Sequence, residues 1–307
     1  MTKILEVENL TKIYGSYTAV DHISFSLEKG QILGFLGPNG AGKTTTIQML
    51  LGISTVEGGS IKYFGKDFFK HRVESLSRIN FASAYNTLQG RISVWENLLI
   101  FAGLYSVKKP KKRILELTEY FEVGGLLNHR FWDLSAGQKT RVNIIKSLLN
   151  NPELLLLDEP TASLDPDIAD KVLSFIETLK SDEKLSILYT SHNMEEVTRI
   201  CDKVIILDKG KIVAQDTPLQ LTKRINQAQL KITFEGKKTK VENYLNAKEQ
   251  GFSFINDFTV IINTTETLIP KLIFGISNEN IFITDIEVKK PTLEDVFLSI
   301  ARGGKND

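Results

Sequence analysis

The first part of the chain alternates apolar with polar residues or collects apolar residues in short runs, and both patterns predict strands. Alternation predicts strands over Ile4 to Tyr14 and over Ala19 to Leu27, with a turn near Gly15. Gln31 to Leu36 is a short apolar run that leads into a glycine-rich segment, and Thr45 to Leu51 after it has a helical pattern. Strand, glycine loop and helix in this order form the context that a phosphate-binding loop requires.

The middle of the chain changes to helical spacing. Apolar residues between about Arg72 and Asn150 recur every three or four positions, which predicts a helical insertion in an α/β domain. Leu154 to Leu157 and Ile187 to Thr190 are apolar runs typical of strands buried on both faces. A helix is predicted between them over Asp165 to Lys180, and a hairpin over Val204 to Ala214 follows.

After about Pro218 the composition shifts to Lys, Asn, Thr and Gln, which indicates a second domain. We expect an α/β domain over residues 1–220, with a helical subdomain over about 72–150, and a small α+β domain over 221–307. The second domain shows no catalytic constellation. Its predicted strands are Leu230 to Phe234, Ser253 to Asn263 and Ile281 to Val288, and its predicted helices are Val241 to Asn246, Leu268 to Phe274 and a last helix that opens at Pro291.

The composition of the chain argues against nucleic-acid binding, disulfide bonds and membrane-spanning helices. The 307 residues include 38 basic and 37 acidic ones, a net charge of +1 that gives no electrostatic case for nucleic acid as a partner. A single cysteine, Cys201, permits no internal disulfide and fits a reducing, intracellular compartment. No apolar run approaches the roughly 20 residues of a membrane helix, so we expect any membrane role to be peripheral and to act through a partner.

The glycine-rich segment fits the pattern GxxxxGK[ST]. Its glycines let backbone N–H groups converge on phosphates beside the positive end of the following helix. The Lys43 ammonium would neutralise the β- and γ-phosphates, and the Thr44 hydroxyl would ligate Mg²⁺. The predicted nucleotide-binding residues of this loop are Gly37, Pro38, Asn39, Gly40, Ala41, Gly42, Lys43, Thr44 and Thr45.

Two carboxylates and a histidine follow the predicted buried strands. Asp158 is predicted to hold Mg²⁺, and Glu159 to act as the general base for water attack on the nucleotide. His192 would contact the γ-phosphate and hold the attacking water. Adjacent carboxylates are often a solvated edge and a lone histidine is often structural, but both alternatives weaken beside a phosphate loop. Tyr14, which closes the first strand, is predicted to stack on adenine, although aromatic residues at strand ends commonly pack against their neighbours.

In combination these motifs resemble the ATP-binding subunit of an ABC transporter. GPNGAGKTT corresponds to the family's Walker A motif, LLLLDEP to Walker B, and LSAGQ over Leu134 to Gln138 to its LSGGQ signature, with Ala136 in place of one glycine. Ala162 to Asp165 resembles the D-loop. The resemblance covers about Leu5 to Pro218 and implies a P-loop ATPase core of the ABC type with a mixed sheet, using ATP and Mg²⁺.

The same resemblance implies a mechanism. Two such domains sandwich two ATP molecules head to tail, and each ATP meets one subunit's phosphate loop and the other's signature residues Ser135, Gly137 and Gln138. One departure concerns the family's Q-loop glutamine. Without gaps that position falls on Ala84, and with a shifted loop Asn86 or Gln89 would take the role.

The tail adds a second resemblance. Pro291 to Phe297 is similar to the C-terminal helix of the separate ATPase subunits of bacterial exporters, although a sheet-covering amphipathic helix is an equally good interpretation. We therefore predict an ATPase at the cytoplasmic face of the membrane that energises transmembrane permease subunits, with a second ATP-binding subunit as partner. A homodimer is preferred over a heterodimer.

The alternative is a soluble ABC-type ATPase that acts on ribosomes or DNA. Ribosome-acting members usually carry two cassettes, and DNA-repair members carry long coiled coils or zinc sites, whereas this chain has one phosphate loop and no cysteine pairs.

Overall fold

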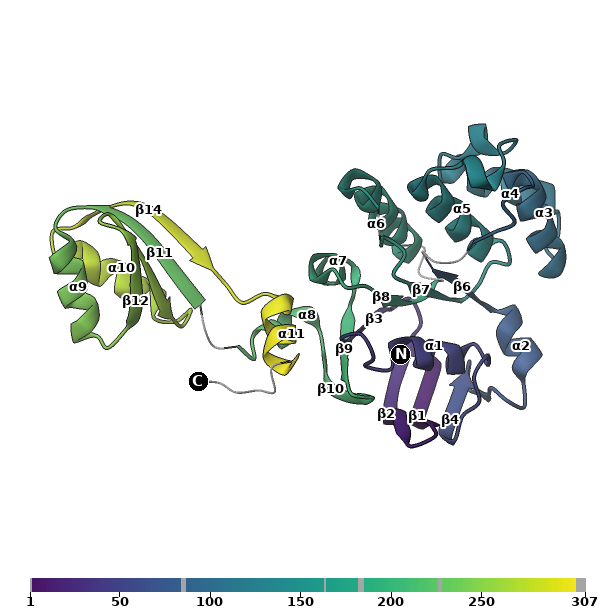
Figure 1. Ribbon diagram of the computed structural model, residues 1–307, viewed down its shortest axis with the longest axis horizontal. Coiled ribbons are helices and arrows are strands. Elements are labelled where there is room, and N and C mark those ends of the chain that lie inside the picture. The colour runs from purple at the N-terminus through teal and green to yellow at the C-terminus, as the bar shows by residue number, and fades with distance from the viewer. Residues whose placement is uncertain (1, 84–86, 163, 182–184, 226–227, 302–307) are drawn as a thin grey trace. The chain divides into compact units, whose positions relative to one another are not determined.

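The computed structural model describes residues 2–83, 87–162, 164–181, 185–225 and 228–301 (Figure 1). The chain divides into two compact units, Met1–Pro218 and Leu219–Asp307. Every helix among the described residues is too short or too polar to span a lipid bilayer.

The first unit is built on a six-stranded sheet. Its strands are β3 (Ile32–Leu36), β6 (Ile79–Ser83), β7 (Leu154–Asp158), β8 (Ser186–Thr190), β9 (Lys203–Asp208) and β10 (Lys211–Asp216). Their order is β10-β9-β3-β8-β7-β6, and only β10 runs antiparallel to its neighbour, so the predicted mixed sheet is confirmed. Strands β3 and β8 are buried along their whole length, as apolar runs in a doubly covered sheet require. Because β3, β7 and β8 are parallel, their carboxyl ends meet at one edge, where ligands bind in such sheets.

A second, antiparallel sheet completes the N-terminal part of this unit. It consists of β1 (Lys3–Tyr14), β2 (Tyr17–Glu28), β4 (Gly58–Tyr63) and β5 (Lys66–Asp67), in the order β2-β1-β4-β5. The hairpin turns at Gly15, whose φ of +60° favours glycine. Apolar residues of this sheet share one core with β3 and with α1 (Lys43–Leu50). The apolar pattern did not predict β4 and β5.

The described residues of the segment predicted to be helical form four helices. They are α2 (Arg72–Ser77), α3 (Val94–Leu104), α4 (Pro110–Tyr120) and α5 (Ala136–Leu148), with short 3₁₀ turns at Gly124–Leu126 and Phe131–Asp133. The prediction of helix from Arg72 onward is wrong at Ile79–Ser83, which is strand β6. This short run pairs in parallel with β7. Because β7 is distant in the sequence, the pairing leaves no periodic pattern in the residues of β6 themselves.

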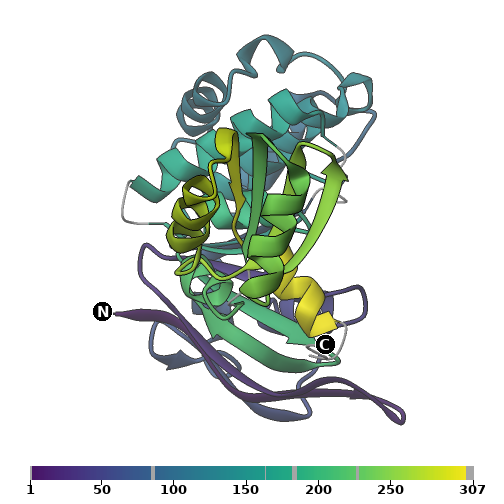
Figure 2. The same cartoon turned by 90° about the vertical axis from the view of Figure 1, so that its left-hand side faces the viewer.

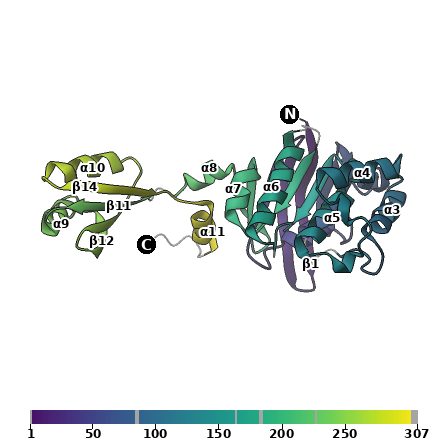
Figure 3. The ribbon, with the colours of Figure 1, turned by 90° about the horizontal axis from the view of Figure 1, so that it is seen from above.

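Two further helices flank the sheet. They are α6 (Pro166–Ser181) and α7 (Met194–Ile200). Helix α6 buries Val172, Leu173 and Ile176 and contacts α5. Helix α5 also contacts α4 and α3, so these helices form a continuous layer (Figure 3).

The second unit has its own sheet and its own core. Its elements follow the order β11 (Ala228–Glu235), α9 (Lys238–Ala247), β12 (Gly251–Asn256), β13 (Thr259–Thr264), α10 (Ile269–Asn278) and β14 (Phe282–Lys289). The strands pair antiparallel in the order β12-β13-β11-β14, which is a ferredoxin-like split βαβ arrangement. Both helices pack on the same face of the sheet (Figure 2).

Two predictions for this unit need correction. The single strand predicted over Ser253 to Asn263 is two strands, because the chain turns at Asp257 and Phe258, where Asn256 Oδ1 accepts the Phe258 N–H at 2.8 Å. The last helix, α11 (Leu293–Ala301), begins after Pro291 rather than at it. Thr292 caps this helix, since its hydroxyl accepts the Asp295 N–H and its own N–H donates to the Asp295 carboxylate. A short helix, α8 (Pro218–Thr222), spans the boundary between the units.

Candidate functional site

The glycine loop lies between β3 and α1, as predicted. Gly42 is the N-cap of α1 with φ +102°, and a Cβ added there would lie 2.5 Å from the Ala19 carbonyl oxygen, so only glycine fits. Lys43 Nζ donates to the carbonyl oxygens of Gly37 at 2.5 Å and Pro38 at 3.2 Å. The loop therefore folds around the ammonium group of its own lysine.

Lys43 is buried, with 7% of its surface exposed. Burial lowers the pKa of its ammonium group, while the negative charges of Glu159 and Asp158 act in the opposite direction. A desolvated cation beside converging backbone N–H groups is an environment that suits a phosphate.

The acidic pair lies at the carboxyl end of β7. Thr190, the last residue of β8, donates its hydroxyl to Asp158 Oδ1 at 2.6 Å. The Glu159 N–H donates to both Thr190 Oγ1, at 3.0 Å, and Thr190 O, at 3.1 Å. Glu159 has φ +51°, an uncommon conformation for a residue with a side chain, and these bonds from the neighbouring strand hold it there.

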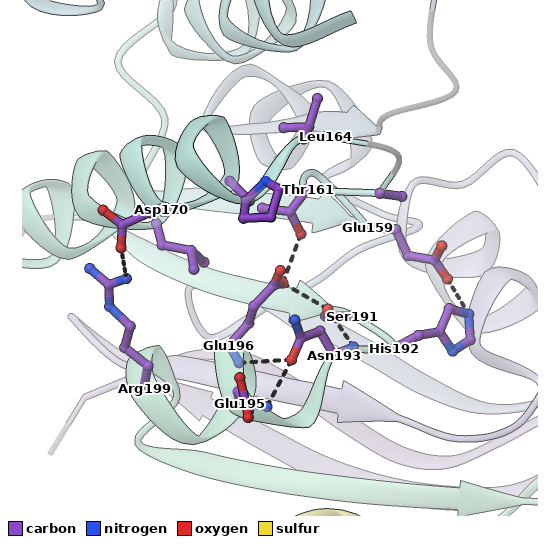
Figure 4. Close-up of a pocket in the computed structure, with 14 residues that line it drawn as sticks. Glu159, Thr161, Leu164, Asp170, Ser191, His192, Asn193, Glu195, Glu196 and Arg199 are labelled. Atoms are coloured by element: carbon purple, nitrogen blue, oxygen red, sulfur yellow. Dashed lines mark hydrogen bonds and ion pairs between the residues drawn. The ribbon is translucent and has the colours of Figure 1, made fainter.

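His192 and Glu159 are in direct contact. His192 Nε2 lies 2.6 Å from Glu159 Oε1, and the histidine side chain is 49% exposed whereas the glutamate side chain is 15% exposed. Figure 4 shows the two side chains pointing toward one another. Glu159 and His192 were predicted from separate motifs, and in the structure they form one contacting pair.

A cavity of about 620 Å³ brings two residues of the glycine loop, Asn39 and Thr44, together with the predicted Asp158, Glu159 and His192. Gln48, Phe81 and Ser83 also line it and were not predicted. Ser83 ends β6 opposite Asp158 of β7, and it was missed because β6 itself was missed. The residues lining the cavity are Asn39, Thr44, Ile47, Gln48, Leu51, Ile53, Phe81, Ser83, Asp158, Glu159 and His192.

Tyr14 does not line this cavity. Its side chain is about half exposed, its hydroxyl lies 3.5 Å from Ser54 Oγ, and Lys12 Nζ lies 4.9 Å from its ring centre. Tyr17, which was not predicted, donates its hydroxyl to the Gly40 carbonyl oxygen of the phosphate loop at 3.2 Å.

The signature residues lie apart from the cavity, at the start of α5. Ser135 Oγ accepts the Gln138 N–H at 3.3 Å and the Ser135 N–H donates to Gln138 Oε1 at 2.9 Å, so these two residues form a capping box. A Cβ on Gly137 would lie 2.5 Å from Ile168 Cγ2 of α6, which explains the need for glycine. None of the three signature residues lines the cavity.

The predicted Q-loop positions Ala84 and Asn86 lie outside the described residues. The other alternative, Gln89, accepts the Arg91 N–H with its side-chain oxygen at 3.5 Å and does not line the cavity.

Comparisons with known proteins identify the family of the chain. The model of the family described as "ABC transporter" matches residues 20–162. The chain is 32% identical to the linearmycin resistance ATP-binding protein LnrL of Bacillus subtilis (strain 168), over 97% of this chain and 98% of that protein. It is 34% identical to the bacitracin transport ATP-binding protein BcrA of Bacillus licheniformis, over 99% of each. Among solved structures, cbiO1 from Clostridium perfringens, part of the ABC transporter complex cbiONQ, matches with a TM-score of 0.65 and 26% identity, covering 74% of this chain and 95% of that one.

Proposed function

Because this chain belongs to the ATP-binding proteins of ABC transporters, we propose that it hydrolyses ATP with Mg²⁺ to drive export through separate transmembrane subunits. The observation that carries the proposal is the cavity at which the phosphate loop, Asp158 and the Glu159–His192 pair meet.

Each group has a role that follows from its position. The loop N–H groups and Lys43 bind the phosphates. Glu159 accepts a proton from the attacking water as general base, and His192, 2.6 Å away, holds that carboxylate in place and reaches the γ-phosphate. Tyr14 remains a proposed adenine contact.

The donors present fit a magnesium ion. Thr44 and Asp158 line the same cavity, and hydroxyl and carboxylate oxygens are ligands that Mg²⁺ accepts, with waters and phosphate oxygens completing its shell. Thr190 orients Asp158 through its hydrogen bond to Oδ1. A bound Mg²⁺ would neutralise charge on the β- and γ-phosphates.

A second copy of the chain is part of the proposal. Ser135, Gly137 and Gln138 lie outside the cavity of their own chain, so two copies facing each other would place the signature of one on the ATP of the other. Two equivalent sites in a homodimer are the simplest arrangement, at the cytoplasmic face of the membrane and bound to permease subunits. Export is supported by relatives named for linearmycin resistance and bacitracin transport, and no observation favours a role on ribosomes or DNA.

The test uses Glu159→Gln in the full chain. With ATP and Mg²⁺ we expect hydrolysis to fall by about 100-fold or more, because the general base is lost, while the variant elutes as an ATP-bound dimer. ADP in place of ATP should leave it monomeric, and Lys43→Ala should neither bind ATP nor dimerise. A Glu159→Gln variant that stays monomeric with ATP, or that keeps the wild-type rate, would contradict the proposal.

A further inference from the structure

A buried carboxylate that the sequence did not single out lies next to the catalytic pair. Glu196, in the first turn of α7, is 7% exposed. Its Oε2 atom accepts hydrogen bonds from three hydroxyl groups, those of Thr161 at 2.7 Å, Tyr189 at 2.8 Å and Ser191 at 2.9 Å. Figure 4 shows the bonds from Thr161 and Ser191. Burial and the neighbouring carboxylate raise the pKa of Tyr189, so its phenol stays protonated and donates. Three donors on one oxygen satisfy a charge that would otherwise be costly to bury.

The three donors come from two segments of the site. Thr161 follows Glu159 by two residues, and Ser191 directly precedes His192. Tyr189 is a buried residue of β8, so it anchors the carboxylate to the central sheet. Glu196 is therefore the point at which the segment carrying the general base is tied to the segment carrying the histidine.

Further bonds hold the carboxylate and its donors. Ser191 Oγ accepts the Asn193 N–H at 3.0 Å, and Asn193 Oδ1 caps α7 by accepting the Glu195 N–H at 2.9 Å. Thr161, Ser191 and Glu196 line a second cavity of about 460 Å³, which shares Glu159 and His192 with the cavity of the phosphate loop.

We propose that Glu196 is a positioning residue for hydrolysis, which fixes the separation of His192 and Glu159 by binding the hydroxyl groups of the segments next to them. This inference rests on the proposed ATPase function. Thr190 holds the Glu159 N–H from one side, and a fixed segment after Glu159 supports its left-handed backbone conformation from the other side, so that its carboxylate stays 2.6 Å from His192.

The test compares Glu196→Gln with Glu195→Gln in the full chain. The neutral amide oxygen carries less negative charge than the carboxylate oxygen that it replaces, so its hydrogen bonds to the three hydroxyl donors are weaker. We expect kcat for ATP hydrolysis to fall about 10- to 100-fold in Glu196→Gln, with KM and ATP affinity changed less than about 3-fold, since the phosphate loop is untouched. Glu195 is exposed on the same helix turn, so its variant should keep the wild-type kcat.

Two further variants separate positioning from folding. Thr161→Val removes one of the three hydroxyl donors and should lower kcat by a smaller factor of about 3 to 10 at unchanged ATP affinity. In a His192→Ala background, Glu196→Gln should cause little further loss of kcat, because the contact that it positions is already absent.

The inference would be overturned if Glu196→Gln lost ATP binding together with kcat, if it kept the wild-type kcat, or if its effect were equally large without His192. A wild-type chain that binds and hydrolyses no ATP would instead refute the proposed function, so the two failures are distinguishable.

Discussion

Lys146 makes the stability of the first unit depend on pH in a direction that can be calculated. Its side chain lies in α5 and is buried, Nζ donates to the Phe81 carbonyl oxygen of β6 at 2.9 Å, and the Phe101 ring centre lies 5.5 Å away. Burial lowers the pKa of this ammonium group from 10.5 to about 8. We expect Lys146→Met to remove the pH dependence that this shift causes.

The sign and size follow from proton linkage. Below about pH 8 the Lys146 side chain is protonated in both the folded and the unfolded chain, and burial of its charge lowers the free energy of unfolding. Between about pH 8 and 10.5 the unfolded chain holds a proton that the folded chain has released, so the free energy of unfolding rises with pH. Each pKa unit corresponds to roughly 1.4 kcal/mol, so wild type should gain about 2 kcal/mol relative to Lys146→Met between pH 7.5 and 10.

Urea unfolding at the two pH values measures this difference. Both tryptophans of the chain, Trp95 and Trp132, lie in the first unit, so their fluorescence reports that unit. Lys171→Met, at an exposed position of α6, is the matched control and should differ from wild type by the same amount at both pH values. If the difference between wild type and Lys146→Met also stayed constant, the reasoning from burial would be wrong.

Three substitutions test the nucleotide site. Gly42→Ala should weaken ATP binding at least about 10-fold in a nucleotide titration. The added Cβ would lie 2.5 Å from the Ala19 carbonyl oxygen, and the φ of +102° costs a residue with a side chain roughly 1–3 kcal/mol. An unchanged affinity for ATP would contradict this prediction. Gly137→Ala should lower the turnover of ATP about 10-fold without changing the affinity for ATP. The added Cβ would clash with Ile168 and shift the signature residues, which we propose contact the ATP of the second copy. An unchanged turnover would count against the proposed dimer. Tyr14→Ala should weaken ATP binding by about 1–3 kcal/mol if the ring stacks on adenine, and an unchanged Kd would show that Tyr14 only packs at its strand end.

Contiguous motifs were predictable from the sequence because their geometry is local. The glycines, Lys43 and Thr44 follow one another in one loop, and Asp158 and Glu159 directly follow an apolar run that predicts a buried strand. The mixed sheet and the ABC-type core were also predicted and are confirmed. In these segments the chemistry and the strand or helix that presents it are encoded within about ten residues.

Tertiary structure alone decided which of these pieces meet. The 2.6 Å contact of Glu159 with His192 exists because β7 and β8 are parallel neighbours, and strand pairing leaves no signal in either strand's own pattern. The same reason explains why β6 and its Ser83 were missed. Of the three hydroxyl groups on Glu196, that of Thr161 comes from a segment that only the folded chain brings to it. In the sequence this buried carboxylate therefore looked like one more acidic residue at the start of a helix.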